Sequence, residues 1–288
     1  MIESFTINDY NLSQVPKEGN TSIIISELKH FETEVKSHSL SLKYTLNGSE
    51  IYNLGKKSFN VSEGNFLITP PKQKIEAIVK GSKITKAICL HFDKKMVNEA
   101  YQSVFKSIDT DHTEKDFTPE EFIPLHLKND EHHLHQALKM LTQSEIDFPS
   151  KNEKLMQICA EVCKSQLNVK KQYLSLGAVK LSTQIEIIQR LYKARHFIQD
   201  FCLINIDLQT IAETAFLSKF HLLRYFKEAF QITPHQYLIH CRLEKALELV
   251  KHNSLSITDI AKKVGFADAP IFSKAFKKKY GYSPTKQL

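Results

Sequence analysis

An internal repeat in the last third of the chain constrains the fold more than any other sequence feature. The first copy contains Ile211-Ala212, Phe226-Lys227 and Ile232-Thr233-Pro234. The second copy contains Ile260-Ala261, Phe276-Lys277 and Tyr282-Ser283-Pro284. The offset is 49 residues at the start of the unit and 50 at its end. A fixed offset of this length indicates two copies of one supersecondary unit.

Each copy is predicted to be a helix, a short turn and a second helix. The expected helices are 208–215 and 219–230 in the first copy, and 260–264 and 269–280 in the second. Side chains suited to capping precede them: Asp207, Ser218, Ser256 and Asp268. Between the copies, Thr233-Pro-His-Gln236 has the spacing of a capping box and opens a helix that extends to about His252.

The second helix of each copy is predicted to have a core face and an outer face. Leu222 and Phe226 are expected in the core of the first copy, and Phe272 and Phe276 in that of the second. The outer faces contain Phe220, Leu223, Arg224 and Lys227, and Pro270, Ser273, Lys274 and Lys277. A helix with a small cationic outer face suits a DNA major groove.

The positive charge of the chain lies in this same segment. The net charge is +7 over 288 residues, yet residues 180–288 hold 17 basic and 9 acidic residues. The rest of the chain is close to neutral, so we expect the C-terminal part to meet a polyanion. All four arginines, Arg190, Arg195, Arg224 and Arg242, lie here and are candidates for contacts that need a planar fork.

The first hundred residues are predicted to form short strands. Apolar residues alternate with polar ones from Leu40 to Leu46, and Asn47-Gly48 then predicts a two-residue hairpin. Further strands are expected at 51–54, 58–61, 66–69, 75–79 and 84–92. Many short strands with tight turns favour a small barrel or sandwich.

Helical spacing resumes after Phe92. A short helix is expected at 96–105, followed by an acidic loop at 110–124 and by helices at 129–143 and 151–167. The last two helices predict an antiparallel pair, which serves either as a dimer interface or to pack on the strands.

Residues 208–288 resemble the DNA-binding domain of the AraC/XylS family. The most specific stretch is Ile260-Ala-Lys-Lys-Val-Gly-Phe-Ala-Asp268, followed by Gly281-Tyr-Ser-Pro284. The resemblance implies two helix-turn-helix units that enter successive major grooves of double-stranded DNA. It also implies transcriptional regulation, chiefly activation, with RNA polymerase as a partner. The expected DNA-binding residues are Ser218, Lys219, Phe220, His221, Leu223, Arg224, Lys227, Asp268, Ala269, Pro270, Ile271, Ser273, Lys274 and Lys277.

Some positions depart from the family pattern. Gln231 stands where the family usually has glycine, so a different exit turn is expected in the first unit. Leu223, Pro270 and Ile271 are apolar where reading positions are often polar.

The region 40–92 resembles, more weakly, the cupin-like sensor barrel of such regulators. His91 is the one candidate metal ligand in this stretch, which has no His-x-His pair, so we expect no metal, no cofactor and no enzyme activity. A ligand-sensing or purely structural barrel is favoured. His38 shares strand parity with Leu40, Leu42 and Tyr44, which makes His38 and Tyr44 the candidate ligand-binding residues.

The expected fold class is therefore α+β and multidomain. It comprises a cupin-like β-barrel (1–108), a helical hairpin for dimerisation or linkage (109–181) and an all-α domain with two helix-turn-helix units (182–288). The expected function is sequence-specific regulation of transcription, with a small-molecule effector and a second copy of the chain as candidate partners. The alternatives are a cupin enzyme, or a protein-interaction barrel, fused to a DNA-binding tail.

The sequence also predicts where such a protein works. No run of 18 apolar residues occurs, and the first residues do not have the pattern of a signal peptide. The five cysteines are scattered, which is typical of reduced thiols. We therefore expect a cytoplasmic protein without a membrane partner.

Overall fold

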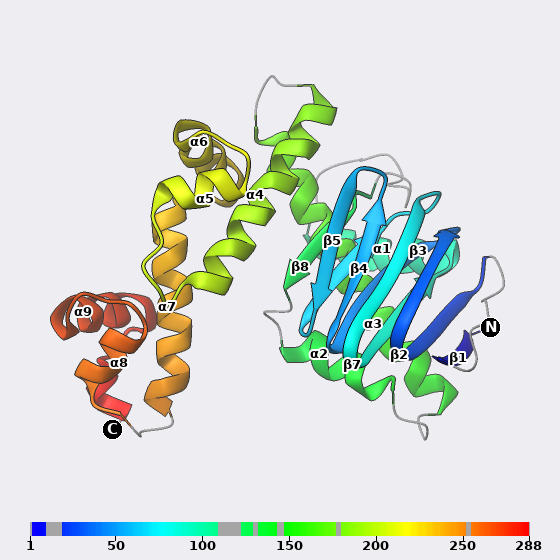
Figure 1. Cartoon of the computed structure of the whole chain (residues 1–288), viewed down its shortest axis with the longest axis horizontal. Coiled ribbons are helices and arrows are strands. Elements are labelled where there is room, and N and C mark those ends of the chain that lie inside the picture. The colour runs from blue at the N-terminus through cyan, green and yellow to red at the C-terminus, as the bar shows by residue number, and fades with distance from the viewer. Residues whose placement is uncertain are drawn as a thin grey trace. The chain divides into compact units, whose positions relative to one another are not determined.

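The computed structural model describes residues 2–9, 19–108, 122–128, 132–142, 147–176, 180–251 and 255–287. These residues form two compact units, 1–170 and 171–288 (Figure 1). The predicted three-part division, with boundaries after 108 and 181, stays a prediction. Most of the acidic loop expected at 110–124 lies outside the described residues.

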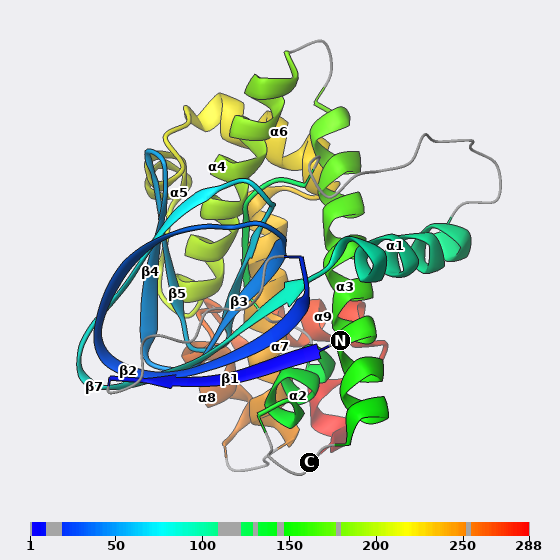
Figure 2. The same cartoon turned by 90° about the vertical axis from the view of Figure 1, so that its right-hand side faces the viewer.

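The N-terminal unit is built on one mixed sheet of eight strands. Their order is β1-β2-β7-β3-β6-β8; in addition, β4 pairs with β7, and β5 pairs with β4. The strands are β1 Ile2–Asn8, β2 Thr21–Lys36, β3 Leu40–Asn47, β4 Ser49–Leu54, β5 Lys57–Ser62, β6 Asn65–Thr69, β7 Lys74–Phe92 and β8 Leu125–Lys128. The expected α+β class is confirmed. The sheet is strongly curved (Figure 2), but β1 and β8 end the strand order without pairing with each other, so it is not a closed barrel.

Two strand predictions need correction. Asn47-Gly48 connects β3 to β4, but β3 pairs with β6 and β7 whereas β4 pairs with β5 and β7, so this turn closes no hairpin. Gly48 has φ +86°, and a Cβ there would lie 2.6 Å from Oγ1 of Thr85, which explains the glycine without a hairpin. The two strands expected at 75–79 and 84–92 are one long strand, β7, since both halves pair with β2.

Helices cover one face of this sheet. They are α1 Lys94–Ile108, α2 His132–Met140 and α3 Phe148–Leu174, and α3 runs across the boundary between the units. Figure 2 shows α2 and α3 outside the curve of the sheet. The predicted helix pair corresponds to α2 and α3. Leu138, Leu155 and Ile158 of this pair are buried without any second chain, as expected if the pair packs on its own unit. The dimer role stays a prediction.

The C-terminal unit is helical. It contains α4 Leu181–Phe201, α5 Leu208–Thr214, α6 Lys219–Phe230, α7 Pro234–Lys251, α8 Ile257–Lys263, α9 Ala269–Tyr280 and a 3-10 turn, η2 Pro284–Gln287. The two predicted second helices, 219–230 and 269–280, have the predicted bounds. As expected, Leu222, Phe226, Phe272 and Phe276 are fully buried, so apolar spacing located the core face of both helices.

Candidate nucleic-acid interface

Side-chain caps position the two helices of each repeated unit. In the first unit, Asp207 accepts a hydrogen bond from the Thr210 N–H at 2.7 Å, and Ser218 accepts one from the His221 N–H at 3.2 Å. In the second, Ser256 accepts from the Asp259 N–H at 3.1 Å. All these caps satisfy N–H groups that a helix start leaves unpaired.

The remaining predicted caps are also confirmed. Asp268 accepts from the Ile271 N–H at 2.7 Å and begins α9. The capping box between the units forms in both directions: Gln236 Oε1 accepts from the Thr233 N–H at 2.9 Å, and Thr233 Oγ1 accepts from the Gln236 N–H at 3.2 Å. The start of α7, which joins the two units, is therefore set by local chemistry.

The turns of the two units share one backbone geometry. Phe216, in the first turn, has φ 54°, and Gly265, in the second, has φ 83°. Gln231, which ends α6, has φ 59°, and Gly281, which ends α9, has φ 82°. The expectation of a differently built exit turn at Gln231 is therefore wrong. Gln231 takes the left-handed conformation, and its amide Nε2 donates to the Glu228 carbonyl at 2.8 Å.

The residues predicted to bind DNA lie on the surface of α6 and α9 and at their starts. Phe220 is 69% exposed, Ile271 54% and Leu223 41%. Ala269 and Ser273 are half-buried. The other predicted residues are exposed: Ser218, Lys219, His221, Arg224, Lys227, Asp268, Pro270, Lys274 and Lys277. Their role in DNA binding stays a prediction.

Three of the four arginines donate hydrogen bonds to other parts of the helical unit. Arg190 donates to the Phe216 carbonyl at 2.8 Å, and Arg195 donates to the Tyr237 hydroxyl at 2.8 Å. Arg242 donates to the backbone carbonyls of Cys202 and Ile204 at 2.8 and 3.0 Å, and burial lowers its pKa. These three arginines therefore position the helices.

Arg224 differs because its side chain lies on the exposed face of α6. Its Nε donates to Oε1 of Glu228 at 2.9 Å, one turn further along the helix, and its guanidinium lies 5.4 Å from the Tyr225 ring centroid. An exposed pair of this kind is worth little in free energy, so a phosphate or base can displace the carboxylate.

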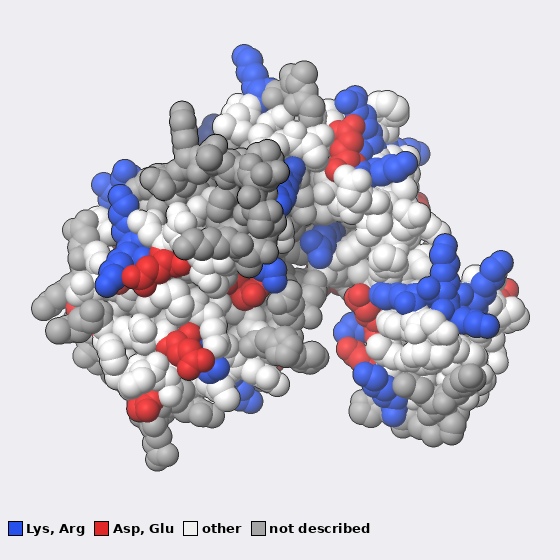
Figure 3. Space-filling view, turned by 180° about the vertical axis from the view of Figure 1, so that it is seen from behind, with Lys and Arg blue, Asp and Glu red and all other residues white. Residues whose placement is uncertain are grey.

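In Figure 3, lysine and arginine side chains gather on the surface of the C-terminal unit that carries α8 and α9.

The two predicted ligand-binding residues face different environments. His38 lines a cavity of about 510 Å³ on the concave side of the sheet. Tyr44 does not line this cavity: it is fully buried and forms a hydrogen bond with His135 of α2. Side chains alternate along β3, so Lys43 rather than Tyr44 faces the cavity. No group of three or more potential metal ligands occurs among the residues that the structure describes.

Sequence reasoning placed His38 at a ligand site and named His91 only as a candidate metal ligand, and it missed the other polar residues of the cavity. Lys43, Cys89 and His91 line it together with Glu50 and Tyr52. Lys43 is 6% exposed, and Glu50 is also buried. One sequence feature could have indicated them: Lys43 lies on a predicted strand between Ser41 and Thr45, which share its face of the strand. All three polar side chains are buried. Only the pairing of β3 with β7 shows which residue it meets.

The comparisons with known proteins concern mainly the helical unit. A family model described as a helix-turn-helix domain matches residues 211–287. A protein described as probable transcriptional regulator LumQ, from Photobacterium leiognathi, is 32% identical over 91 residues, which are 32% of this chain and 37% of that protein. The HTH-type transcriptional activator RhaS of Escherichia fergusonii is 31% identical over 162 residues, 56% of each chain.

A solved structure of ToxT from Vibrio cholerae aligns along most of the chain. The alignment covers 93% of this chain and 96% of that one, with 13% identity and a TM-score of 0.37. The match with the curated relatives spans from about a third to just over half of their length. No helix in the described part of the chain is long and apolar enough to cross a membrane. The repeat, its caps and the family match together show that residues 211–287 are a helix-turn-helix domain of the AraC type.

Proposed function

We propose that this protein is a sequence-specific DNA-binding regulator of transcription that works in the cytoplasm. The observation that carries the proposal is the duplicated unit: α6 and α9 each follow a tight turn and present exposed cationic and apolar side chains. A lone helical hairpin has many uses. Here two such units are joined by one helix, and they carry the excess positive charge of the chain. This arrangement suits double-stranded DNA, whose phosphates and grooves repeat regularly.

The length of α7 agrees with binding to successive grooves. It has 18 residues, and at 1.5 Å per residue this corresponds to about 27 Å. Adjacent major-groove segments on one DNA face are ~34 Å apart. In the proposed complex α6 and α9 enter two such segments, with Ser218, Asp268 and the helix starts close to the phosphates.

Arg224 is proposed to read bases and Lys277 to contact phosphate. The guanidinium fork can pair with guanine O6 and N7, and Phe220 and Leu223 beside it can meet thymine methyl groups. On α9, Pro270 and Ile271 offer few hydrogen bonds, and Lys274 and Lys277 supply point charges. The first unit therefore discriminates among sequences, and the second mainly anchors the protein.

Activation is the proposed outcome of binding. It rests on the similarity to RhaS, which is described as a transcriptional activator, and it makes RNA polymerase a proposed partner. The N-terminal unit is proposed to sense a small-molecule effector, because its cavity of about 510 Å³ has the size and mixed lining of small-molecule sites. A homodimer through α2 and α3 is also proposed.

The test is a selection of bound sequences from random duplexes with the full chain, followed by a footprint. We expect one enriched motif, with two protected major-groove segments on one DNA face about one helical turn apart. No enriched motif, or protection on opposite faces, would contradict the proposal. Lys94→Ala is the matched control, because it removes an exposed lysine from α1, in the N-terminal unit.

A further inference from the structure

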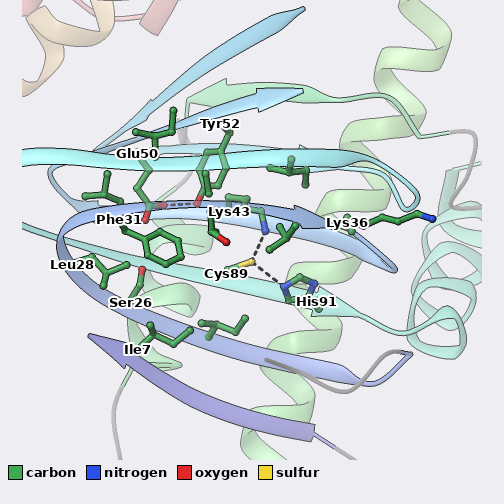
Figure 4. Close-up of a pocket in the computed structure, with 18 of the residues that line it drawn as sticks. Ile7, Ser26, Leu28, Phe31, Lys36, Lys43, Glu50, Tyr52, Cys89 and His91 are labelled. Carbon is green, nitrogen blue, oxygen red and sulfur yellow. Dashed lines mark hydrogen bonds between the residues drawn. The ribbon is translucent and has the colours of Figure 1, made fainter. Parts of the chain in front are cut away.

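The cavity of the N-terminal unit has a mainly apolar lining, in which Lys43, Cys89 and His91 form a polar cluster. Leu28, Phe31, Ile75 and Val79 belong to its apolar lining, from β2 and β7. Figure 4 shows Cys89 with the side chains of Lys43 and His91 pointing toward it. A space of about 510 Å³ is far larger than a water or a peroxide molecule needs, so the lining suits an organic molecule with one reactive end.

Strand register brings the cluster together. Lys43 on β3 lies directly opposite Cys89 on β7, and Ser41 lies opposite His91. The Lys43 Nζ donates to the Cys89 Sγ at 2.7 Å, and the His91 Nε2 lies 3.2 Å from the same sulfur. The Nδ1 of His91 lies 3.2 Å from the Ser39 hydroxyl, which orients the imidazole. A thiol held against a base that a third group orients is the arrangement of an activated nucleophile.

Cys89 differs from the other four cysteines in exposure. Its side chain is half-buried and lines the cavity, whereas Cys159, Cys163, Cys202 and Cys241 are buried. Burial opposes ionisation of Cys89, but the positive charges of His91 and Lys43 and their hydrogen bonds lower the pKa of the thiol to about 6. Hydrogen bonding with Cys163 and burial raise the pKa of Cys159 well above its usual range. The thiolate is the reactive form of cysteine.

Other titratable groups face the cavity from the neighbouring strands. Glu50 is buried, its pKa is raised by that burial, and it accepts a hydrogen bond from the Tyr52 hydroxyl at 2.5 Å. The remaining groups are His30, Glu32 and Lys36 from β2, and His38 from the turn after it.

We propose that this cavity captures a mostly apolar α,β-unsaturated carbonyl compound through a covalent bond to the sulfur of Cys89. Such a compound would be the effector of the proposed sensor. The covalent capture stands on the cavity alone, and only the role of the compound as a signal rests on the proposed function. Cys89 gives its proton to His91, and the sulfur then bonds to the β-carbon of the compound. The π electrons of the C=C bond shift toward the carbonyl carbon and those of the C=O bond move to the oxygen, which gives an enolate beside the Lys43 ammonium. The proton on His91 then goes to the α-carbon, so the addition needs no oxidant or reductant.

The experiment measures the mass of the intact full chain after exposure to trans-2-nonenal, with peptide mapping of the adduct. We expect one adduct on Cys89 and none in Cys89→Ser or Cys89→Ala. Nonanal, which lacks the C=C bond, is the matched reagent control. Each buried CH₂ favours binding in the apolar cavity, so Cys89 should favour nonenal over acrolein. The ratio of the nonenal rate to the acrolein rate should be at least ~10-fold higher for Cys89 than for the free thiol glutathione.

The pH dependence gives a second readout. The rate of addition should be half-maximal near pH 6, because the thiolate forms as the pH rises through the pKa of Cys89. Lys43→Met and His91→Gln should each move that midpoint upward, toward the ~8.5 of an ordinary thiol. Adducts spread over several thiols, an unshifted midpoint, or oxidation of Cys89 by peroxide without addition of the enal would overturn the proposal. The adduct is measured without DNA. A missing adduct would therefore overturn the covalent capture and leave the proposed DNA binding untouched.

Discussion

Gly265 lies against the guanidinium of Arg242. A Cβ at Gly265 would lie 2.9 Å from Cζ of Arg242, and the backbone there has φ +83°. Arg242 in turn donates to the carbonyls of Cys202 and Ile204, which follow α4. The turn of the second helix-turn-helix unit is thus joined to the end of α4 through one side chain.

Gly265→Ala should destabilise the helical unit because it adds both a clash and a strained φ. We expect a loss of about 1–3 kcal/mol in the free energy of unfolding, measured by urea denaturation of the full chain. Arg242→Met removes the fork but leaves the stem, so the double variant should lose less than the sum of the single changes. Full additivity would show that the two residues do not interact.

Gln231→Gly should stabilise the same unit. Gln231 has φ 59° at the end of α6, where a residue with a Cβ pays a steric cost that glycine avoids. The net gain in the free energy of unfolding should be only about 0.5–1 kcal/mol. The relief of backbone strain is partly offset because the hydrogen bond from the Gln231 amide to the Glu228 carbonyl is lost. Gly281→Gln, the reciprocal change at φ 82°, should destabilise by a similar amount. A thermal melt of both variants checks this, and an unchanged or lower stability for Gln231→Gly would contradict it.

Arg224→Ala should weaken binding to the selected site by about 1–3 kcal/mol and relax preference at one or two base pairs. Glu228→Gln should have the opposite effect on affinity, since it frees the guanidinium from an exposed ion pair. Titrations against selected and scrambled duplexes measure both changes. Equal weakening of both duplexes by Arg224→Ala would make Arg224 a phosphate contact and end the proposed division between the units.

Lys277→Ala should weaken binding to selected and scrambled DNA about equally. Lys277 is exposed on α9, and a phosphate contact releases counterions without reading sequence. The slope of log affinity against log salt should fall by about one unit. Lys94→Ala, on α1, should leave the slope unchanged, and a change there would point to a contact outside the helical unit.

The sequence alone determined the helical unit almost completely. Its information is local: Asp207, Ser218, Ser256 and Asp268 cap helices within three residues of themselves, and apolar spacing of four residues marks the core side. The repeat then confirmed the pattern by showing it twice. Even the departure at Gln231 left the turn geometry unchanged, since Gln231 (φ 59°) takes the same left-handed conformation as Gly281 (φ 82°).

Only the tertiary structure decided the cavity. Lys43 and Cys89 are 46 residues apart, and they meet because β3 pairs with β7 in one register. A shift of one residue would send Lys43 to the opposite face of the sheet, in place of Tyr44. Register depends on the packing of the whole sheet, which no short stretch encodes. The Asn47-Gly48 turn shows the same limit, since long-range pairing separated two strands that local chemistry would have joined.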